Sequence, residues 1–414
     1  MKKAVLLTAV LFAAIALAAG EIKISVEAGW HTRNNCIVQA DVSQLNIDGN
    51  AAITMYETGS KTRRAVACQT IVEDGKIARI CWLLDGETRA CTRRTFAVHT
   101  AVASAGAPLP APLMSADDDG KTIVLKKDGH SILQYNHARV EPPEGVKSLY
   151  GRSGFLHPVW SPAGNVLTTI QPKDHIHHYG IWNPWTKIEY GGKIYDLWNI
   201  GGGQGTVKSE RIETKYGGNI FTGYTATLAH CIFDASKETV IMTEEWRVKA
   251  WNVPEGFLWD FESHLTPAVS LPVLIKEYRY AGFGYRATET WTKNNCEMLT
   301  SEGKIRRDID GTRARWIYVT GAAGNGRAGL LFMAHPANYN SPEPLRIWDE
   351  NANGNRGDVF INFAPTKNRD WLLEPASRKV LQYRILAYDG EMTAARANQL
   401  WIDFAYPPMV VISG

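Results

Sequence analysis

The chain has 414 residues, of which 45% are hydrophobic and 21% are charged. This composition is typical of a folded protein and excludes wholesale disorder, and the 36 glycines and 19 prolines follow no collagen-like period. The formal charge is +3, and it falls to about +1 if Lys2 and Lys3 are removed with a leader segment. A charge so close to zero gives no indication of nucleic-acid or membrane-surface binding. We therefore expect a small or neutral partner.

The N-terminal segment has the pattern of a secretory signal peptide. Lys2 and Lys3 precede the apolar run 4–16, and residues 16–18 fit an A-x-A cleavage site. A membrane anchor is disfavoured, because the run is short and rich in alanine and no other stretch approaches the ~20 apolar residues that a spanning helix needs. We predict a signal peptide at residues 1–18 and an exported protein, periplasmic or extracellular, with no stable membrane anchor after cleavage.

Export permits disulfides, and four of the six cysteines fall in the first hundred residues. We expect two disulfides there, although the sequence cannot choose among the three pairings. No C-x-x-C spacing is present, so a structural zinc site is not predicted. The six cysteines are Cys36, Cys68, Cys81, Cys91, Cys231 and Cys296.

Residues 19–100 are predicted to form a small β-sandwich. Short runs with period-two alternation, such as Ile22–Val26 and Cys36–Val42, are separated by Asp/Gly turns. The segment 101–119 is rich in alanine and proline and ends in three aspartates, so we expect a linker there.

Residues 120–414 are predicted to form a large β-sandwich domain that carries the site. Phe257–Leu265 alternates strictly, which is typical of a strand with one buried face. The pattern favours one helix, Thr393–Trp401, with Thr393 as its N-cap. The expected fold class is all-β, and by analogy we expect a two-sheet supersandwich of the kind seen in galactose mutarotases. Further strands are expected at Val240–Val248, Leu274–Tyr280, Arg315–Val319, Gly329–Ala334 and Val380–Tyr388.

The densest candidate site is Pro172–Trp182, which holds three of the 11 histidines within four positions. In an extended strand, His175 and His177 would share a face, and His178 would point the other way beside Asp174. His-x-His on a strand is a common way to present two imidazoles to one metal or one substrate. Ordinary loop hydrogen bonds are the alternative, but titratable groups gather at functional sites. We therefore expect a functional cluster.

The segment Lys276–Arg286 mixes charged and aromatic residues around two glycines. Glu277 and Arg279 would share one strand face, either as a structural ion pair or beside a ligand that approaches the glycines.

A second segment, Ala334–Asn340, ends a strongly apolar strand, so His335 is expected in a site loop. Arg346 and Trp348 follow and would supply a guanidinium and a stacking surface.

Several common catalytic motifs are missing from the sequence. Gly201–Gly205 does not fit a dinucleotide fingerprint, because Thr206 stands where the last glycine belongs, and no P-loop lysine follows. There is no G-x-S-x-G elbow and no H-E-x-x-H. Nucleotide binding, serine hydrolysis and zincin chemistry therefore lack their usual sequence support.

The stretches His157–Gly164 and Asp174–Trp182 resemble a bacterial family of secreted proteins labelled the PmoA family, or methane oxygenase PmoA. The resemblance continues through Gly282–Arg286 and His335–Asn338 and covers roughly residues 120–410. Members of that family resemble parts of glycan-degradation systems, which implies sugar chemistry. Methane oxidation is not carried over, because membrane subunits with that activity span the bilayer several times and no such spans follow the leader here.

From these residues we predict an exported carbohydrate-active enzyme, a hydrolase or lyase, that works by hydrolysis, elimination or epimerisation. Histidine needs the least pKa shift to act as an acid or base, and burial can raise the pKa of a carboxyl group. The predicted catalytic residues are His177, His178, Glu277 and His335. The predicted substrate-binding residues are Asp174, His175, Trp182, Arg286, Asn338, Tyr339, Arg346 and Trp348.

One alternative is a non-catalytic glycan-binding protein. Its aromatic residues would form a binding platform, and its histidines would be structural. This alternative is favoured if the histidine cluster, Glu277 and His335 do not converge.

The other alternative is an enzyme in which His175 and His177 bind a divalent metal with Asp174, Glu277 or His335 as third ligand. Ile176 stands where the resembling family commonly has a further histidine, which weakens a three-histidine site. Apart from this metal, no cofactor is predicted, and the expected partner is a carbohydrate substrate rather than nucleic acid.

Overall fold

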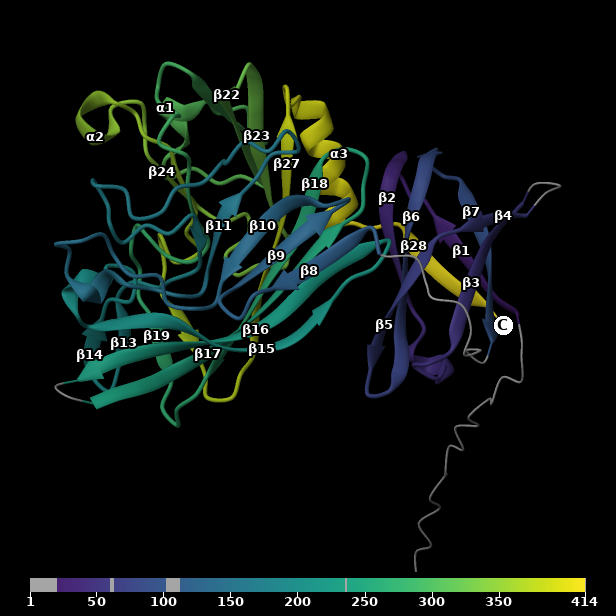
Figure 1. The fold of residues 1–414 in the computed structure, drawn as a ribbon, viewed down its shortest axis with the longest axis horizontal. Helices are drawn as coiled ribbons and strands as arrows, with labels where there is room; N and C mark the ends of the chain where they lie inside the picture. Colours follow the sequence, from purple (N-terminus) through teal and green to yellow (C-terminus); the bar gives the residue numbers. More distant parts are fainter. Residues whose placement is uncertain (1–20, 60–62, 102–111, 235–236, 414) are drawn as a thin grey trace, which may run out of the picture. The chain divides into compact units, whose positions relative to one another are not determined.

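The computed structural model describes residues 21–59, 63–101, 112–234 and 237–413. The predicted signal peptide at 1–18 lies outside this part of the chain. The structure is about 54% strand and 8% helix, and the pairs that build its main sheets are antiparallel. The predicted all-β fold class is therefore confirmed (Figure 1).

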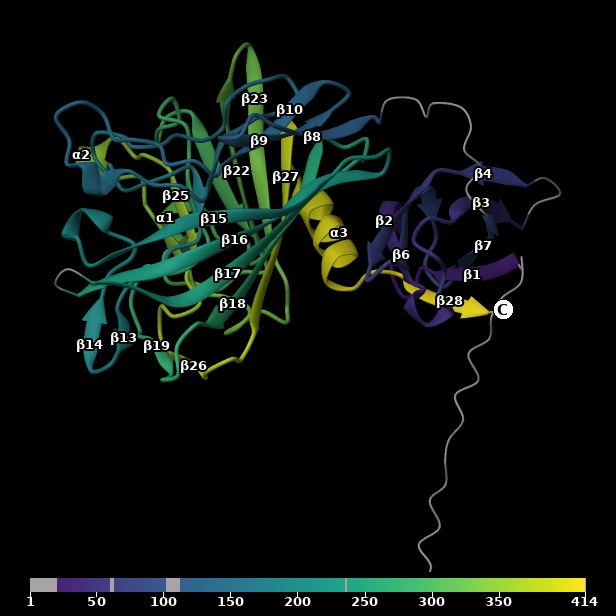
Figure 2. The ribbon, with the colours of Figure 1, turned by 60° about the horizontal axis from the view of Figure 1, so that its bottom comes forward.

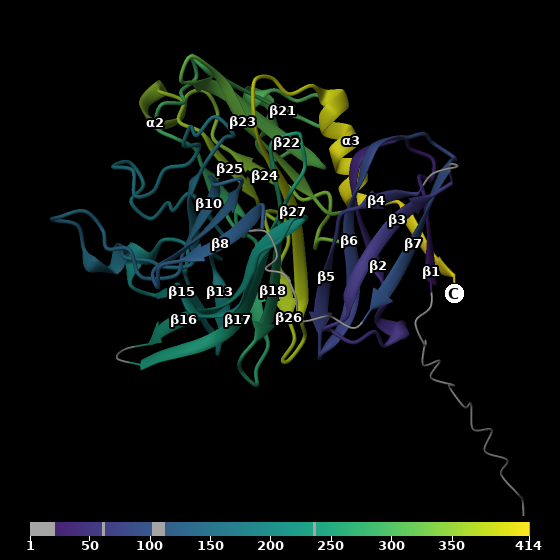
Figure 3. The same ribbon diagram turned by 45° about the vertical axis from the view of Figure 1, so that its right-hand side comes forward.

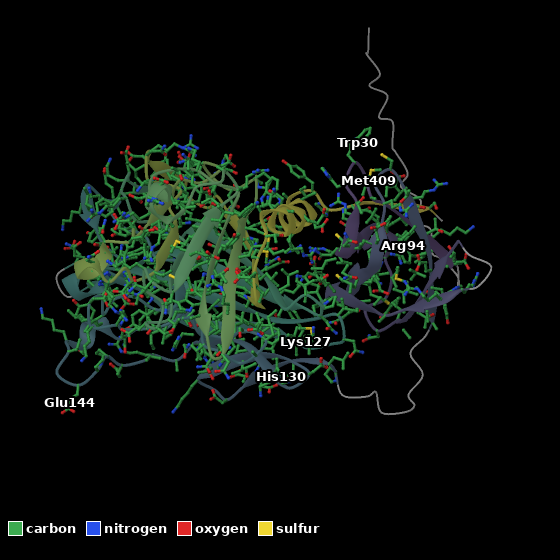
Figure 4. All side chains as sticks on the ribbon, turned by 90° about the horizontal axis from the view of Figure 1, so that it is seen from above. Trp30, Arg94, Lys127, His130, Glu144 and Met409 are labelled. Carbon is green, nitrogen blue, oxygen red and sulfur yellow. The ribbon has the colours of Figure 1, made fainter. Side chains whose placement is uncertain are left out.

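The first of two structural units comprises residues up to 109 together with 408–414. Its two sheets share one apolar core, in which the rings of Trp82 and Phe96 lie 5.3 Å apart. On its surface Trp30 is 85% exposed (Figure 4). One sheet has the order β28 (Met409–Ser413), β1 (Glu21–Glu27), β7 (Arg93–Ala101), β3 (Ala52–Thr58), β4 (Arg64–Val66). The other has the order β2 (Arg33–Asp41), β6 (Lys76–Thr88), β5 (Cys68–Glu73).

The last strand of the chain corrects the predicted extent of the large domain, 120–414. Strand β28 pairs antiparallel with β1, so Val410 lies opposite Val26 and Ile412 opposite Ile24. The final residues therefore complete a sheet of the first unit.

The predicted disulfides are wrong, because none of the six cysteines forms a disulfide. Strand register explains this in the first unit. Cys36 lies opposite Leu84, and Cys81 lies opposite Gln39. Each of these strand pairings places a different side chain across from the thiol.

The predicted linker 101–119 is wrong in its last part, because Met114–Asp118 form β8. This strand pairs with β9 (Thr122–Lys127), and its acidic end is neutralised by lysines. Lys126 Nζ lies 2.8 Å from Asp117, and Lys215 Nζ lies 2.6 Å from Asp118. Residues 102–111 lie outside the described part of the chain.

The second unit, residues 110–407, is built from two eight-stranded sheets and one four-stranded sheet. The first is a long curved sheet (Figure 2) with the order β15 (Gly205–Tyr216), β16 (Phe221–Asp234), β17 (Lys237–Trp251), β18 (Phe257–Pro267), β27 (Lys379–Asp389), β23 (Gly326–Ala334), β22 (Trp316–Ala323), β21 (Cys296–Thr300). The second has the order β24 (Leu345–Ile347), β25 (Phe360–Phe363), β20 (Gly284–Arg286), β12 (Ile181–Trp182), β11 (Phe155–Val159), β10 (His130–Asn136), β9, β8. The small sheet has the order β14 (Lys193–Tyr195), β13 (Ile188–Tyr190), β19 (Val273–Ile275), β26 (Trp371–Leu373).

The two large sheets share a single apolar core. Tyr285 of β20 and Phe332 of β23 bridge it with ring centroids 4.9 Å apart. Strand β18 carries the predicted alternation, and Trp259 and Phe261 are fully buried. The strands predicted around residues 240–248, 315–319, 329–334 and 380–388 coincide with parts of β17, β22, β23 and β27.

The predicted strand Leu274–Tyr280 is wrong beyond Ile275, where β19 ends. The backbone N–H of Glu277 donates to the Asp370 side chain at 2.6 Å. A side chain therefore takes the hydrogen bond that a neighbouring strand would otherwise have made.

The predicted helix is confirmed as α3 (Ala394–Ala405), and the Thr393 hydroxyl caps it by accepting from the N–H of Arg396. The helix lies against β22 and β23 (Figure 3), where Trp401 Nε1 donates to the carbonyl of Ala334 at 2.9 Å. The other α-helices, α1 (Arg306–Ile309) and α2 (Ala352–Asn355), are single turns. Among the described residues, no helix has the length and apolar character needed to cross a bilayer.

Candidate functional site

The three neighbouring histidines lie in a pair of tight turns and not in a strand. The N–H of His175 donates to the carbonyl of Pro172 at 3.0 Å, and the N–H of His178 donates to the carbonyl of His175 at 2.9 Å. Ring centroids are 5.5 Å apart for His175 and His177 and 4.8 Å apart for each of the other two pairs. The expected extended strand is wrong, and the turns bring all three imidazoles together. We call residues 174–178 the histidine turn.

A glycine fixes the point where the histidine turn joins β12. Gly180 has a φ of +57°, which L side chains rarely adopt. A Cβ atom at this position would lie 2.3 Å from the carbonyl oxygen of Leu156 in β11. The chain therefore passes so close to the neighbouring strand that only glycine fits.

Aromatic rings form a wall behind the histidine turn. His178 is 1% exposed and lies 5.1 Å from Phe360, 5.1 Å from Trp182 and 5.5 Å from Trp348, measured between ring centroids. His175 lies 4.6 Å from Trp348. Trp182 is fully buried, so it supports His178 rather than presenting a stacking surface.

A buried arginine holds the acidic end of the turn. Arg286 of β20 places Nη2 2.9 Å from Asp174, and its guanidinium lies 4.8 Å from the ring of Trp348. Asp174 also accepts hydrogen bonds from His175 Nδ1 at 2.9 Å and from Asn353 Nδ2 at 2.6 Å. Burial raises the pKa of Asp174, but the hydrogen bond from His175 and the charge of Arg286 outweigh it, so this carboxyl is ionised.

His177 and His178 are held in the neutral form. Burial lowers the pKa of His177 to about 4, and the charges of His175 and Arg152 act in the same direction. Burial also lowers the pKa of His178 well below its ordinary value. Within the described residues, neither ring nitrogen of His177 has a hydrogen-bond partner. His177 can therefore accept a proton from a ligand at neutral pH.

Two of the four predicted catalytic residues lie away from the histidine turn. Glu277 is an exposed residue of the loop after β19. His335 follows β23 and packs edge to face on Phe404 of α3, with centroids 5.3 Å apart. In the described part of the chain, no contact joins either side chain to the three histidines.

Two predicted binding residues have structural roles elsewhere. Asn338 is buried, and its Nδ2 donates to Glu343 at 2.7 Å. Tyr339 lies parallel to Trp371 with centroids 4.6 Å apart. A third, Arg346, lies at the edge of the aromatic wall.

The contacts of Arg346 show how it joins that wall. Its Nη2 donates to the hydroxyl of Tyr280 at 3.3 Å, and its Nη1 lies 3.0 Å from Asp310. Tyr280 also accepts a hydrogen bond from Trp348 Nε1 at 3.3 Å. Arg346 therefore reaches the site through Tyr280.

Several residues that surround the histidine turn were not predicted from the sequence. They lie on segments that are distant in the sequence, and no local motif marks them. Only the packing of β11, β12, β20 and β25 brings them together. They are Arg152, Trp198, Tyr280, Asn353 and Phe360.

The metal alternative lacks a third ligand in this arrangement. Across residues 21–413, apart from the short gaps named above, no three His, Cys, Asp or Glu side chains form a group that could hold a metal ion. Asp174 is already engaged by Arg286, His175 and Asn353.

The fold and site define an all-β sandwich protein with a histidine turn set against an aromatic wall. Residues 122–402 match the family of unknown function DUF6807, and the chain belongs to that family. No curated protein is a significant match to the sequence.

Three solved structures are weakly similar to this chain. An alpha-mannosidase from Enterococcus faecalis V583 has a TM-score of 0.49 at 8% identity, with 95% of this chain and 46% of that chain covered. A glycosyl hydrolase family 38 protein from Enterococcus faecalis gives 0.44 at 7%, covering 95% and 47%. A galactose mutarotase related enzyme from Lactobacillus acidophilus gives 0.35 at 8%, covering 67% and 100%. The chain spans about half the length of the first two, and at these scores the likeness carries no argument.

Proposed function

We propose that this protein is an exported carbohydrate-active enzyme that binds a sugar at the histidine turn and acts on it by acid–base chemistry. The observation that carries the proposal is the convergence of three imidazoles on the aromatic wall, beside the Asp174–Arg286 ion pair. The buried rings hold the imidazoles in place, and a neutral imidazole can accept a proton from a ligand.

Two of the histidines have a ring nitrogen available for acid–base work. Asp174 accepts from Nδ1 of His175, which leaves Nε2 of that ring to exchange a proton with a ligand. His177 is neutral and has no hydrogen-bond partner in the described part of the chain, so it suits the role of base. His178 is enclosed by rings, so we assign it to positioning rather than proton transfer.

Hydrolysis, elimination and epimerisation all remain compatible with two imidazoles. The resemblance of residues 120–410 to proteins of glycan-degradation systems supports a sugar substrate. The signal-peptide pattern of residues 1–18 supports export.

The test is product formation from a panel of oligosaccharides by the wild type and by His177→Ala. We expect product from the wild type and none from the variant, with unchanged circular dichroism. His130→Ala is the matched control, because His130 is exposed on β10 (Figure 4) and no contact among the described residues joins it to the turn, so it should keep full activity.

The dependence of activity on pH provides a second test of the role of His177. Because burial lowers the pKa of His177 to about 4, activity should persist as the pH falls through 6.5 and disappear only near pH 4. The profile of kcat/KM against pH measures this. Full activity in His177→Ala, or a loss of activity centred near pH 6.5, would contradict the assignment.

A second candidate is a glycan-binding protein without catalysis. The observation that favours it is the position of Glu277 and His335, which do not join the histidine turn. Oligosaccharide binding without any product, retained in His177→Ala, would establish this function instead.

A further inference from the structure

Arg152 is a buried charge that no described residue pairs by a hydrogen bond or an ion pair. Its side chain is 1% exposed, and none of its three guanidinium nitrogens has a hydrogen-bond partner among the described residues. A buried unpaired charge is expensive to keep, and folded proteins normally pair it or lose it. Burial lowers the pKa of Arg152 only to about 10, so the guanidinium is charged at neutral pH.

The acidic residue that influences Arg152 is Glu244, and its carboxylate already has other hydrogen-bond partners. Glu244 on β17 is fully buried and contributes to the electrostatic environment of Arg152 without forming an ion pair with it. The Glu244 carboxylate interacts with Asn183 at 2.6 Å, Ser263 at 2.5 Å and His230 at 2.8 Å. None of these contacts involves Arg152, so its N–H groups remain open to another acceptor.

Arg152 lies beside the histidine turn. Its guanidinium is 6.0 Å from the ring of Tyr179, the residue that directly follows His178. Its charge also lowers the pKa of His177, which places the two side chains within electrostatic reach.

A second guanidinium borders the same turn. Arg286 is 1% exposed and gives Nη2 to Asp174, but its Nη1 is buried without a partner among the described residues. Unsatisfied N–H groups from two arginines therefore adjoin the imidazoles.

We propose that the sugar carries a carboxylate, as a uronic acid does, and that Arg152 binds this carboxylate beside His177. The inference rests on the proposed function and names its substrate class. A guanidinium presents N–H groups in a planar fork that matches the two oxygens of a carboxylate. A water molecule would accept some of these hydrogen bonds but would leave the charge unbalanced.

The first experiment uses the full-length wild-type protein and needs no variant. Binding is measured by calorimetry for glucuronate against glucose, and for galacturonate against galactose. The uronamides are included because they keep the shape and remove the charge. We expect each uronate to bind at least about tenfold tighter than its neutral counterpart and its amide.

The second experiment uses Arg152→Gln, with Arg152→Lys as the variant that keeps the charge. We expect Arg152→Gln to lose the preference for uronates and Arg152→Lys to retain part of it. Without ligand, Arg152→Gln should melt at the same or a higher temperature, because it removes an unpaired buried charge.

The matched control is Arg384→Gln. Arg384 is also buried, at 6% exposed, but it lies 2.6 Å from Asp260. This variant should melt at a lower temperature, because it leaves the Asp260 carboxylate without its arginine partner. It should keep the preference for uronates.

The outcomes separate this inference from the proposed function. Equal binding of acidic and neutral sugars by the wild type, or a uronate preference that survives in Arg152→Gln, overturns the inference alone. Tighter binding of sulfated or phosphorylated sugars than of uronates overturns the choice of carboxylate. Failure of every sugar to bind overturns the proposed function and the inference with it. If Arg152→Gln does not fold, the wild-type comparison of acid, amide and neutral sugar decides.

Discussion

At the scale of single residues, Glu343 is a buried acid outside the histidine turn. It is fully buried, and burial raises its pKa to about 7, although hydrogen bonds from Asn338 and Tyr383 act in the opposite direction. The folded protein therefore holds a proton on Glu343 more tightly than the unfolded chain does.

This residue makes the stability of the protein depend on pH. Its contribution to the free energy of unfolding is fully present below about pH 4.5 and is lost as the pH rises through 7. This contribution totals roughly 3 kcal/mol. We expect Glu343→Gln to remove this part of the dependence of unfolding free energy on pH. Urea unfolding between pH 4 and pH 8 measures it. Glu144→Gln, at an exposed site (Figure 4), should behave as the wild type. The same pH dependence in Glu343→Gln and the wild type would show that Glu343 is not the group responsible.

Residue-level prediction from the sequence succeeded where the partners are neighbours in the chain. His175, His177 and His178 were found because they are adjacent, and Asp174 because it precedes them. Glu277 was misplaced, because a strand was expected to continue past Ile275, where the backbone N–H of Glu277 instead donates to the Asp370 side chain. No local pattern marks residues that only folding brings to the turn.

At the scale of elements, Gly180 sets the geometry of the histidine turn. Gly180→Ala combines an unfavourable φ with a clash against the carbonyl of Leu156, and we expect it to cost roughly 1–3 kcal/mol of stability and to weaken sugar binding. Urea unfolding and calorimetry measure these two effects.

The control for this prediction is Gly164→Ala. Gly164 has a φ of +84°, but a Cβ added there would meet no atom within 4 Å, so this substitution tests the conformational cost alone. Its sugar binding should be unchanged. Equal effects of the two substitutions would show that the close approach at Leu156 does not matter.

The length of an element decided whether the sequence revealed it. Strands β17, β18 and β27 are long enough to show period-two alternation, and Thr393 marks α3 by its capping hydroxyl. Strands β12 and β20 have two and three residues, which is too short for any periodicity. The candidate site is built around these short strands, so its geometry could not be predicted.

At the scale of the whole molecule, period-two patterns predicted two sandwiches but not the path of the chain's end. The sequence of the Met409–Ser413 segment does not indicate which strand it pairs with. Its pairing with β1 depends on long-range contacts between the two ends of the sequence.

Removal of residues 408–414 should therefore affect the first unit selectively. It uncovers the edge of β1 and deletes the pairs Val26–Val410 and Ile24–Ile412. We expect faster hydrogen exchange in β1 and a lower melting temperature for the first unit. Hydrogen exchange in β17 and β18 should stay as in the wild type. Unchanged protection of β1 amides would contradict this expectation.

The return of β28 to β1 also has a consequence for biosynthesis. Domains usually fold in the order in which they leave the ribosome. Here the sheet that contains β1 cannot be completed until the whole second unit has been translated. The second unit should thus mature first, and the exposed edge of β1 should be a natural binding site for chaperones while translation continues.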